Sequence, residues 1–333
     1  MGLPDGYQDI RPPPRGLPPD PEDLKRRAYV DLMNRQVLHF TTVDGQRAPM
    51  YAVSSKRTLR PWENPSPRPS PRRSPVPGPE AVGGEEKAGG GAKPKSGGGG
   101  GDTGRLAHAE RAVVILSDVY GWSDRHTRDV ADSVAEVVDA VVFVPDLFRG
   151  DPWAKERPME GYEEWRELHS PERLSGDIRS CVREIRSRFN FDTLGLVGFC
   201  FGGGRALEEA SAGEVEPDAL VVFYPTRYDV DLVAPKLACP VAGFFAGMDT
   251  LPGATKEDAL ALKEHLDKND KVEDFMIRLF KGEHHGFAHR PTGREEDDAE
   301  EAMILATSWL EIYPKRGRRL RGPKVKQTNS FWT

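Results

Sequence analysis

One glycine-rich segment constrains the fold of this chain more than any other. An apolar run, Leu194 to Val197, predicts a buried strand, and it leads directly into the pentapeptide Gly198-Phe199-Cys200-Phe201-Gly202 and then a helical pattern. A turn this sharp between a strand and a helix strains its central residue, so the positions two before and two after it must lack bulk. Gly198 and Gly202 meet this requirement. Cys200 is therefore predicted to stand exposed at the carboxyl end of the strand.

The position of Cys200 at a helix N-terminus has a chemical consequence. Free backbone amides and the helix dipole favour an anion there, and the thiolate is the nucleophilic form of cysteine. The pentapeptide alone is equally compatible with a buried core cysteine beside a glycine-rich turn. The rest of the chain has to decide between these two interpretations.

Short, apolar runs rich in β-branched residues alternate with helical patterns along most of the chain. This alternation predicts an α/β fold with a mostly parallel central sheet and helices on both faces, and with ligands at the carboxyl ends of the strands. The predicted strands are 112–116, 140–144, 194–197, 219–224, 241–245 and 275–280, and the predicted helices are 127–138, 173–188, 205–212, 256–268 and 295–312. Earlier, 37–42 and 49–54 flank the turn signal Asp44-Gly45 and are predicted to be antiparallel edge strands.

Two further chemical groups follow predicted strands. Asp249 lies just after the run at 241–245, and His284 and His285 lie just after the run at 275–280. An acid in such a loop is by itself more often a helix cap or turn former. The order cysteine, aspartate, histidine, each on a loop at one sheet edge, is however that of an α/β-hydrolase triad. We expect Cys200 to be a nucleophile, a histidine to be its base, and Asp249 to orient that histidine.

Attack on a carbonyl also requires donors for the oxyanion that develops. The amide of Phe201, directly after the nucleophile, is one expected donor, and the amide of Val119, past the first parallel strand, is the expected second.

Composition divides the 333 residues into five segments. We expect a largely disordered extension at 1–36 with a possible helix at 23–34, a β-hairpin at 37–60, a disordered Pro/Ser/Gly-rich insertion at 61–104, the α/β core at 105–314, and a basic disordered tail at 315–333. The insertion is interpreted as a spacer between adjacent strands, with a phosphorylation or docking site as the alternative. The tail is interpreted as a solvated terminus, with binding to nucleic acid or an acidic membrane, or a nuclear signal, as alternatives.

Overall charge and cysteine usage argue against several classes of protein and of site. A net charge of −6 gives no general electrostatic case for nucleic acid, and no apolar run is long enough for a membrane span. Cys181, Cys200 and Cys239 form an odd set without Cys-x-x-Cys spacing, which argues against a disulfide framework and a zinc site. We expect no metal and no organic cofactor, and a reducing, cytoplasmic location. The N-terminus fits neither a signal nor a transit peptide.

The core resembles the dienelactone hydrolase family, and most closely its eukaryotic carboxymethylenebutenolidase homologues. The resemblance covers most of residues 112–313 and depends on five motifs: 117–122 (SDVYGW), 144–153 (VPDLFRGDPW), 198–203 (GFCFGG), 247–249 (GMD) and 285–290 (HGFAHR). It implies that His285, which begins the His-Gly-Phe signature, is the base, and that His284 is a loop or structural residue.

The same resemblance implies roles for four more residues. Asp118 occupies the position of a glutamate that, in bacterial members, holds the cysteine inactive until substrate displaces it. Arg290 matches an arginine that can pair with an anionic substrate. Tyr162 and Trp165 match an aromatic pair that lines the pocket, although a half-buried surface helix explains them nearly as well. The segment at 61–104 and the basic tail have no counterpart in the family.

We therefore expect a monomeric cysteine-dependent hydrolase that opens small lactones or cleaves small esters through an acyl-enzyme. One alternative is a hydrolase body recruited as an interaction or structural subunit through its insertion and tail. Another is a thioesterase or acyltransferase that uses the same thiol and imidazole.

Overall fold

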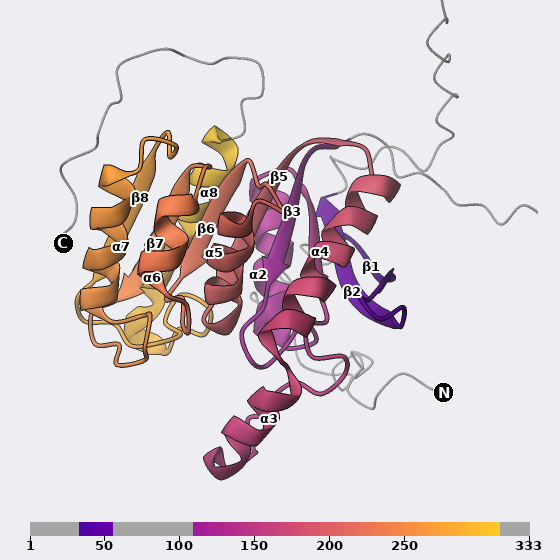
Figure 1. The fold of residues 1–333 in the computed structure, drawn as a ribbon, viewed down its shortest axis with the longest axis horizontal. Helices are drawn as coiled ribbons and strands as arrows, with labels where there is room; N and C mark the ends of the chain where they lie inside the picture. The colour runs from indigo at the N-terminus through magenta and orange to yellow at the C-terminus, as the bar shows by residue number, and fades with distance from the viewer. Residues whose placement is uncertain (1–32, 56–108, 314–333) are drawn as a thin grey trace, which may run out of the picture.

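The computed structural model describes residues 33–55 and 109–313, and it places them around one eight-stranded sheet. Its strands are β1 (Met33–Thr41), β2 (Arg47–Ser55), β3 (Ala109–Leu116), β4 (Val141–Pro145), β5 (Phe191–Phe199), β6 (Ala219–Phe223), β7 (Val241–Ala246) and β8 (Phe275–Phe280), in the order β1-β2-β4-β3-β5-β6-β7-β8 (Figure 1). From β4 to β8 all neighbours are parallel, whereas β1 and β2 are antiparallel additions at one side. The predicted α/β fold with a mostly parallel sheet is confirmed.

Helices cover both faces of the sheet. The α-helices are α2 (Arg125–Val137), α3 (Tyr162–Leu168), α4 (Pro171–Arg188), α5 (Phe201–Ala212), α6 (Val230–Val233), α7 (Lys256–Lys268) and α8 (Glu296–Ile312), and short 3-10 turns are η1 (Met159–Gly161), η2 (Ala234–Lys236) and η3 (Gly293–Glu295). The buried hydrophobic side chains form two clusters, which share the strands and differ in the helices that contribute to them. One contains residues of α4, α5 and α7, and the other contains residues of α2 and α8.

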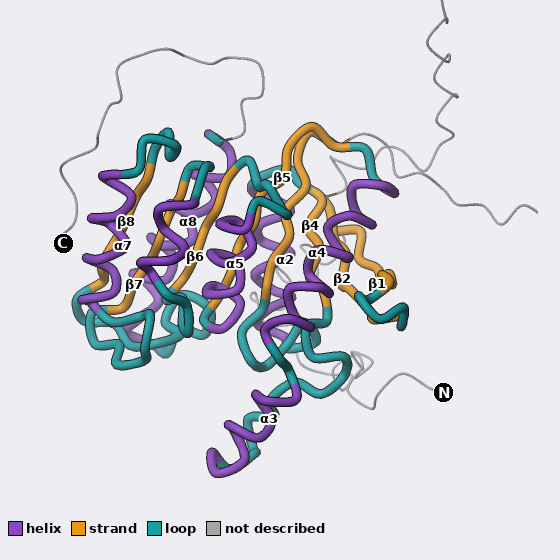
Figure 2. The backbone as a smooth tube through the Cα atoms, viewed as in Figure 1, coloured by secondary structure: helices purple, strands orange, loops and turns teal. Residues whose placement is uncertain are grey.

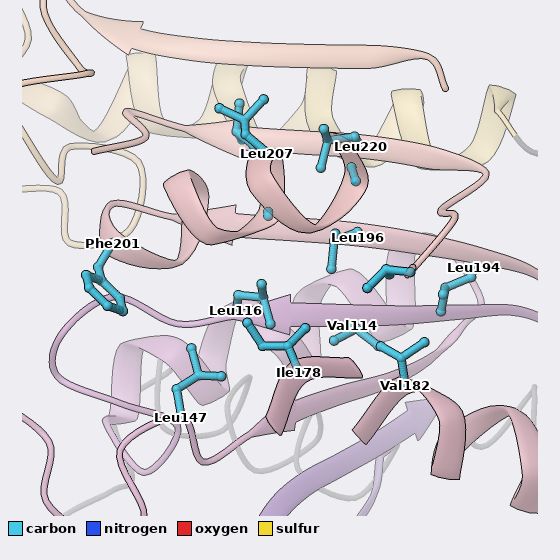
Figure 3. Close-up of a cluster of buried hydrophobic side chains, with 14 of the residues drawn as sticks. Val114, Leu116, Leu147, Ile178, Val182, Leu194, Leu196, Phe201, Leu207 and Leu220 are labelled. Atoms are coloured by element: carbon cyan, nitrogen blue, oxygen red, sulfur yellow. The ribbon is translucent and has the colours of Figure 1, made fainter. Parts of the chain in front are cut away.

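The side chains of each strand divide between these two clusters because successive side chains point to opposite faces. On β3, Val114 and Leu116 pack toward α4 and α5, while Val113 and Ile115 pack toward α2 and α8. Figure 3 shows the first cluster, in which Ile178 of α4 lies over the strands. Burial of these residues on both faces explains the continuous apolar run from Ala112 to Leu116.

The predicted hairpin is present, but its place in the sheet differs from the expectation. β1 begins at Met33, earlier than the predicted boundary at residue 37, and pairs with β2 across the turn at Asp44-Gly45. Of these two strands β1 lies at the edge of the sheet, whereas β2 does not, because it also pairs antiparallel with β4. The strands on either side of the insertion, β2 and β3, are therefore not neighbours. Pairing between distant strands leaves no local signal in the sequence.

A buried polar contact fixes the hairpin to the body of the protein. The hydroxyl of Tyr51 on β2 donates to Asp132 of α2 at 2.6 Å, and Arg35 on β1 donates to the same carboxylate at 2.8 and 2.6 Å. Tyr51 is buried. The hairpin is thus part of the α/β core rather than an appendage.

Several predictions fall on other parts of the chain. The possible helix at 23–34 includes Met33 and Asn34, which belong to β1, and the rest of it lies outside the described residues. The insertion at 61–104 and the tail at 315–333 also lie outside them. Among the helices in the described ranges, none is long and apolar enough to cross a membrane.

The parallel strands bring their carboxyl ends to the same edge of the sheet. Loops gather along this edge, and α3 projects from it (Figure 2). The short helix α6 was not predicted, and a helix at α3 was considered only as an alternative explanation of Tyr162 and Trp165, because four to seven residues give too few turns for a periodic signal.

Candidate active site

The turn between β5 and α5 has the strained geometry that the sequence predicts. Cys200 has φ of 52° and ψ of −115°, a backbone conformation that residues other than glycine rarely adopt. A Cβ atom at Gly198 would lie 2.4 Å from the carbonyl oxygen of Gly202, and one at Gly202 would lie 2.2 Å from that of Leu116. Glycine is required at both positions because backbone approaches backbone there.

The backbone around Cys200 is held from two sides. Its amide donates to the carbonyl of Phe223 at 3.0 Å, and its carbonyl accepts from Gly203 at 3.0 Å and from Thr226 at 3.1 Å. Cys200 is partly exposed at the N-terminus of α5, whereas Cys181 and Cys239 are buried. Burial raises the pKa of Cys239 to about 12 and also raises that of Cys181. Of the three thiols, only that of Cys200 is accessible, and it stands at a helix N-terminus.

Asp249 and His285 meet at the same edge. Nδ1 of His285 lies 2.6 Å from Oδ2 of Asp249, whose side chain is fully buried, and the other oxygen of Asp249 accepts from the amide of Leu251 at 3.0 Å. This contact makes Nδ1 the donor and leaves Nε2 for chemistry. Nε2 is buried and has no hydrogen-bond partner among the described residues. His284, in contrast, is exposed.

The pKa of His285 reports the surroundings of its ring. Burial lowers this pKa, but the hydrogen bond to Asp249 and the thiol of Cys200 raise it more, to about 10. Cys200 is therefore within electrostatic reach of the imidazole. The structure thus brings together three side chains that lie far apart in the sequence.

Both predicted oxyanion donors lie on segments that contact each other. Phe201 is the first residue of α5, so its amide has no acceptor within the helix. Gly202 packs against the end of β3, and the loop that carries Val119 begins there. The carbonyl of Val119 accepts from the amide of Trp153 at 2.8 Å, which fixes this loop.

Asp118 and Arg290 form an ion pair. Arg290 donates to both oxygens of Asp118 and, at 2.8 Å, to Asp124, and its guanidinium lies 4.6 Å from the ring centre of Tyr120. Burial raises the pKa of Asp118, but His289 and Arg290 together lower it below its ordinary value. Arg290 therefore has two carboxylates of the protein as partners, which differs from its predicted role as a partner for substrate.

The carboxylate of Asp118 is occupied by partners other than the cysteine. Its Oδ1 accepts from the amide of Tyr120 at 3.0 Å and its carbonyl accepts from that of Gly121 at 3.1 Å, so it closes a tight turn. In the part of the chain that the structure describes, Asp118 makes no hydrogen bond to Cys200. The predicted inactivating contact is not formed.

The two aromatic residues of α3, Tyr162 and Trp165, have different surroundings. Trp165 is buried, its indole donates to the carbonyl of Asp151 at 2.7 Å, and its ring packs 5.0 Å from that of Phe148. Tyr162 is partly exposed, and its pKa is raised by burial and by Cys200. Tyr162 thus lies near the nucleophile, and Trp165 supports the helix that carries it.

Sequence reasoning missed two buried residues beside the site. Tyr224, at the end of β6, has φ of 35°, and its ring centre lies 4.9 Å from that of His285. Its hydroxyl has no hydrogen-bond partner among the described residues, and burial, Asp118 and Cys200 raise its pKa well above the ordinary value. His289 lies 3.2 Å from the hydroxyl of Thr127 and 3.1 Å from Arg290.

The sequence contained a weak signal for both residues. Tyr224 ends a predicted strand at its carboxyl end, and His289 belongs to the motif that begins at His285. Neither position alone reveals a contact with the site. No group of three or more metal-ligating side chains occurs within residues 33–55 and 109–313.

Known proteins are similar to this chain in sequence and in fold. A profile of the dienelactone hydrolase family matches residues 103–313. The carboxymethylenebutenolidase homologues of Mus musculus and Homo sapiens are 26% and 27% identical over 212 and 210 residues, which cover 62% of this chain and 83% of each relative.

Solved structures share the fold at low sequence identity. A candidate dienelactone hydrolase from Klebsiella pneumoniae superposes with a TM-score of 0.58 at 15% identity, covering 84% of this chain and 99% of that one. An esterase from Pyrococcus furiosus superposes with a TM-score of 0.52 at 13% identity, covering 92% and 99%. Both are similar in fold. From the family match and the arrangement of its core, this chain belongs to the dienelactone hydrolase family and is a hydrolase with the α/β-hydrolase fold.

Proposed function

We propose that this protein hydrolyses small carboxylic esters or lactones through an acyl-enzyme on Cys200. The observation that carries the proposal is the pair formed by Asp249 and His285, whose Nε2 is buried without a partner among the described residues and whose ring is within electrostatic reach of the partly exposed thiol of Cys200. The names of the relatives, carboxymethylenebutenolidase homologues, favour a lactone or ester as the substrate class.

In the first half of the reaction, the sulfur of Cys200 attacks the carbonyl carbon while the imidazole of His285 holds the thiol proton. The amides of Phe201 and Val119 donate to the oxyanion of the tetrahedral intermediate. The intermediate collapses, the carbon–oxygen bond of the ester breaks, and His285 gives its proton to the leaving alkoxide. In a lactone, that hydroxyl stays attached to the acyl group.

In the second half, water attacks the thioester carbonyl and His285 removes its proton. The carbon–sulfur bond breaks, the carboxylic acid is released and Cys200 is restored. Asp249 fixes the imidazole orientation and stabilises its charged form in both halves. Its buried carboxylate and the short hydrogen bond to Nδ1 suit it to this role.

We assign Asp118 to positioning rather than to gating. Its carboxylate closes the turn that carries Val119 and is already paired with Arg290. Cys200 is therefore available without displacement of this carboxylate by substrate.

The test is a panel of para-nitrophenyl esters, lactones and thioesters with the wild type and Cys200→Ala. We expect the substitution to lower kcat by at least about a thousandfold, because it removes the nucleophile and the other two thiols are buried. Iodoacetamide should modify Cys200 well before Cys181 and Cys239, because those two thiols are buried. Unchanged hydrolysis by Cys200→Ala would contradict the proposal, and a thioester-only activity would shift the substrate class.

A further inference from the structure

His289 lies where several parts of the candidate active site meet. Its side chain is fully buried, and its Nδ1 lies 3.4 Å from the carboxylate of Asp118, whose turn carries Val119. The centre of its ring lies 4.5 Å from that of Phe199, which directly precedes Cys200. The ring therefore contacts both the strand that leads to the nucleophile and the turn of an expected oxyanion donor.

The backbone of the same residue is fixed to the loop of the expected base. The amides of His289 and Arg290 both donate to the carbonyl of Gly286, at 3.0 and 2.9 Å. Gly286 directly follows His285 and has φ of 93°, a value that glycine adopts without strain. One tight turn thus holds His285 and His289 in a fixed relation.

The ring of His289 bridges two polar groups in either neutral tautomer. Its Nε2 lies 3.2 Å from the hydroxyl of Thr127 on α2, and its Nδ1 lies 3.1 Å from Nη1 of Arg290. With the proton on Nδ1, the ring donates to Asp118 and accepts from Thr127. With the proton on Nε2, it donates to Thr127 and accepts from Arg290, which itself donates to Asp118. Burial lowers the pKa of His289 more than Asp118 raises it, so the ring is neutral.

His289 and Arg290 hold Asp118 in different ways. Arg290 is shared between Asp118 and Asp124, and its side chain is 18% exposed. The ring of His289 is enclosed and packs on Phe199. His289 is therefore the more rigid partner of Asp118, and it sets the distance between the turn and the end of β5.

We propose that His289 is a positioning residue that holds the turn of Asp118 and Val119 against the end of β5, so that the amide of Val119 meets the oxyanion. This inference rests on the proposed acyl-enzyme mechanism at Cys200, and adds a residue that acts through the turn without touching substrate. An oxyanion donor is effective only at about 2.7 to 3.1 Å from the oxygen, so a small displacement of the turn weakens it.

The test separates stabilisation of the oxyanion from reactivity of the thiol. Hydrolysis of para-nitrophenyl acetate passes through an oxyanion in both halves of the reaction. Alkylation of Cys200 by iodoacetamide displaces iodide from a saturated carbon and forms no oxyanion. The readout is the ratio of kcat/KM for the ester to the second-order rate constant of alkylation.

We expect His289→Phe to lower this ratio at least about tenfold, because the variant keeps a ring against Phe199 but loses both nitrogens. The loss should lie in kcat, with KM nearly unchanged, because the contact with the oxyanion is absent from the bound ester. Alkylation of Cys200 should stay within about twofold of the wild type.

Two more substitutions at the same position identify which nitrogen matters. The side-chain amide of His289→Asn lies near the position of Nδ1, and that of His289→Gln lies near the position of Nε2. The asparagine variant can keep the contact with Asp118 and should restore most of the ratio. The glutamine variant keeps only the side of Thr127 and should restore little.

His169→Phe is the matched control, since it makes the same change at another buried histidine beside an arginine. Nδ1 of His169 lies 2.7 Å from Arg173, and its ring packs against Trp165 and Phe148. The substitution should leave the ratio within about twofold of the wild type, even where it lowers stability.

The outcomes separate this inference from the proposed function. A wild type whose Cys200 is alkylated but that hydrolyses no ester overturns the proposed function and this inference with it. If the wild type hydrolyses the ester, an unchanged ratio in folded His289→Phe, or an equal fall in His169→Phe, overturns the assignment to His289. Equal ratios in the asparagine and glutamine variants overturn it as well. Circular dichroism and thermal unfolding establish that each variant is folded.

Discussion

The contact between Asp249 and His285 gives the two ring nitrogens different tasks. Nδ1 donates to a buried carboxylate, and Nε2 has no hydrogen-bond partner among the described residues, while the thiol of Cys200 lies within electrostatic reach of the ring. The contact also stabilises the charged ring, because the pKa of His285 is raised to about 10 from an ordinary value near 6.5. Protonation of His285 is thus linked to folding.

The sign of this linkage yields a prediction for Asp249→Asn. A pKa raised in the folded state contributes stability that is fully present below about pH 6.5 and is lost as pH rises through about 10. Asp249→Asn should therefore lower the free energy of unfolding by about 1 to 3 kcal/mol at pH 6, and by clearly less at pH 10.5. Urea denaturation at both values measures the difference.

Asp231→Asn is the control for this experiment, because Asp231 is an exposed partner of His265. It should change the free energy of unfolding by less than about 0.5 kcal/mol at either pH. A loss of stability in Asp249→Asn that is equal at both pH values would show that the shifted pKa of His285 is not the cause.

At the scale of elements, the site depends on how closely α5 approaches the strands. The glycines at 198 and 202 let the helix begin directly against β5 and β3, which places Cys200 and the loop of Val119 together. Side-chain bulk at either glycine would separate these elements.

Gly202→Ala tests this packing. Its Cβ would meet the carbonyl of Leu116 at 2.2 Å, and a backbone atom cannot move aside as a flexible side chain can. We expect a loss of at least about 3 kcal/mol in the free energy of unfolding. Gly282→Ala, whose Cβ would meet nothing within 4 Å, should change it by less than about 0.5 kcal/mol. Similar stability of the two variants in chemical denaturation would refute this explanation of the motif.

The elements also show how far the sequence could predict the site. Asp249 and His285 follow short, mostly apolar runs, and parallel strands bring the ends of such runs to one edge, so their proximity could be inferred. The pairing of Arg290 with Asp118 and Asp124 joins residues more than 160 positions apart and depends on side-chain directions. No pattern in the sequence records such a contact.

At the scale of the whole molecule, the antiparallel hairpin and the parallel core form one sheet. The neighbour of β2 could not be predicted, because both β3 and β4 contain an apolar run that could pair with it. The carboxylate of Asp132 joins the two parts through Tyr51 and Arg35. Two expectations from the sequence, that the protein is a monomer and that it is cytoplasmic, stay predictions.

Asp132→Ala tests how strongly the hairpin is coupled to the core. It removes the acceptor of a buried hydroxyl and the carboxylate partner of Arg35, which should cost about 2 to 3 kcal/mol of unfolding free energy. Asp129→Ala on the same helix removes an exposed pair with Arg125 and should cost less than about 0.5 kcal/mol. Equal effects of the two substitutions on thermal unfolding would mean that the hairpin adds little to the stability of the fold.

The central claim is that Cys200 forms a covalent acyl intermediate. The direct measurement is rapid acid quenching during turnover of para-nitrophenyl acetate, followed by mass spectrometry of the proteolytic peptides. The account predicts one acetyl group on the peptide that contains Cys200, and none on those that contain Cys181 or Cys239. Acetyl on another residue, or hydrolysis that continues in Cys200→Ala with no acetyl on Cys200 in the wild type, would contradict it.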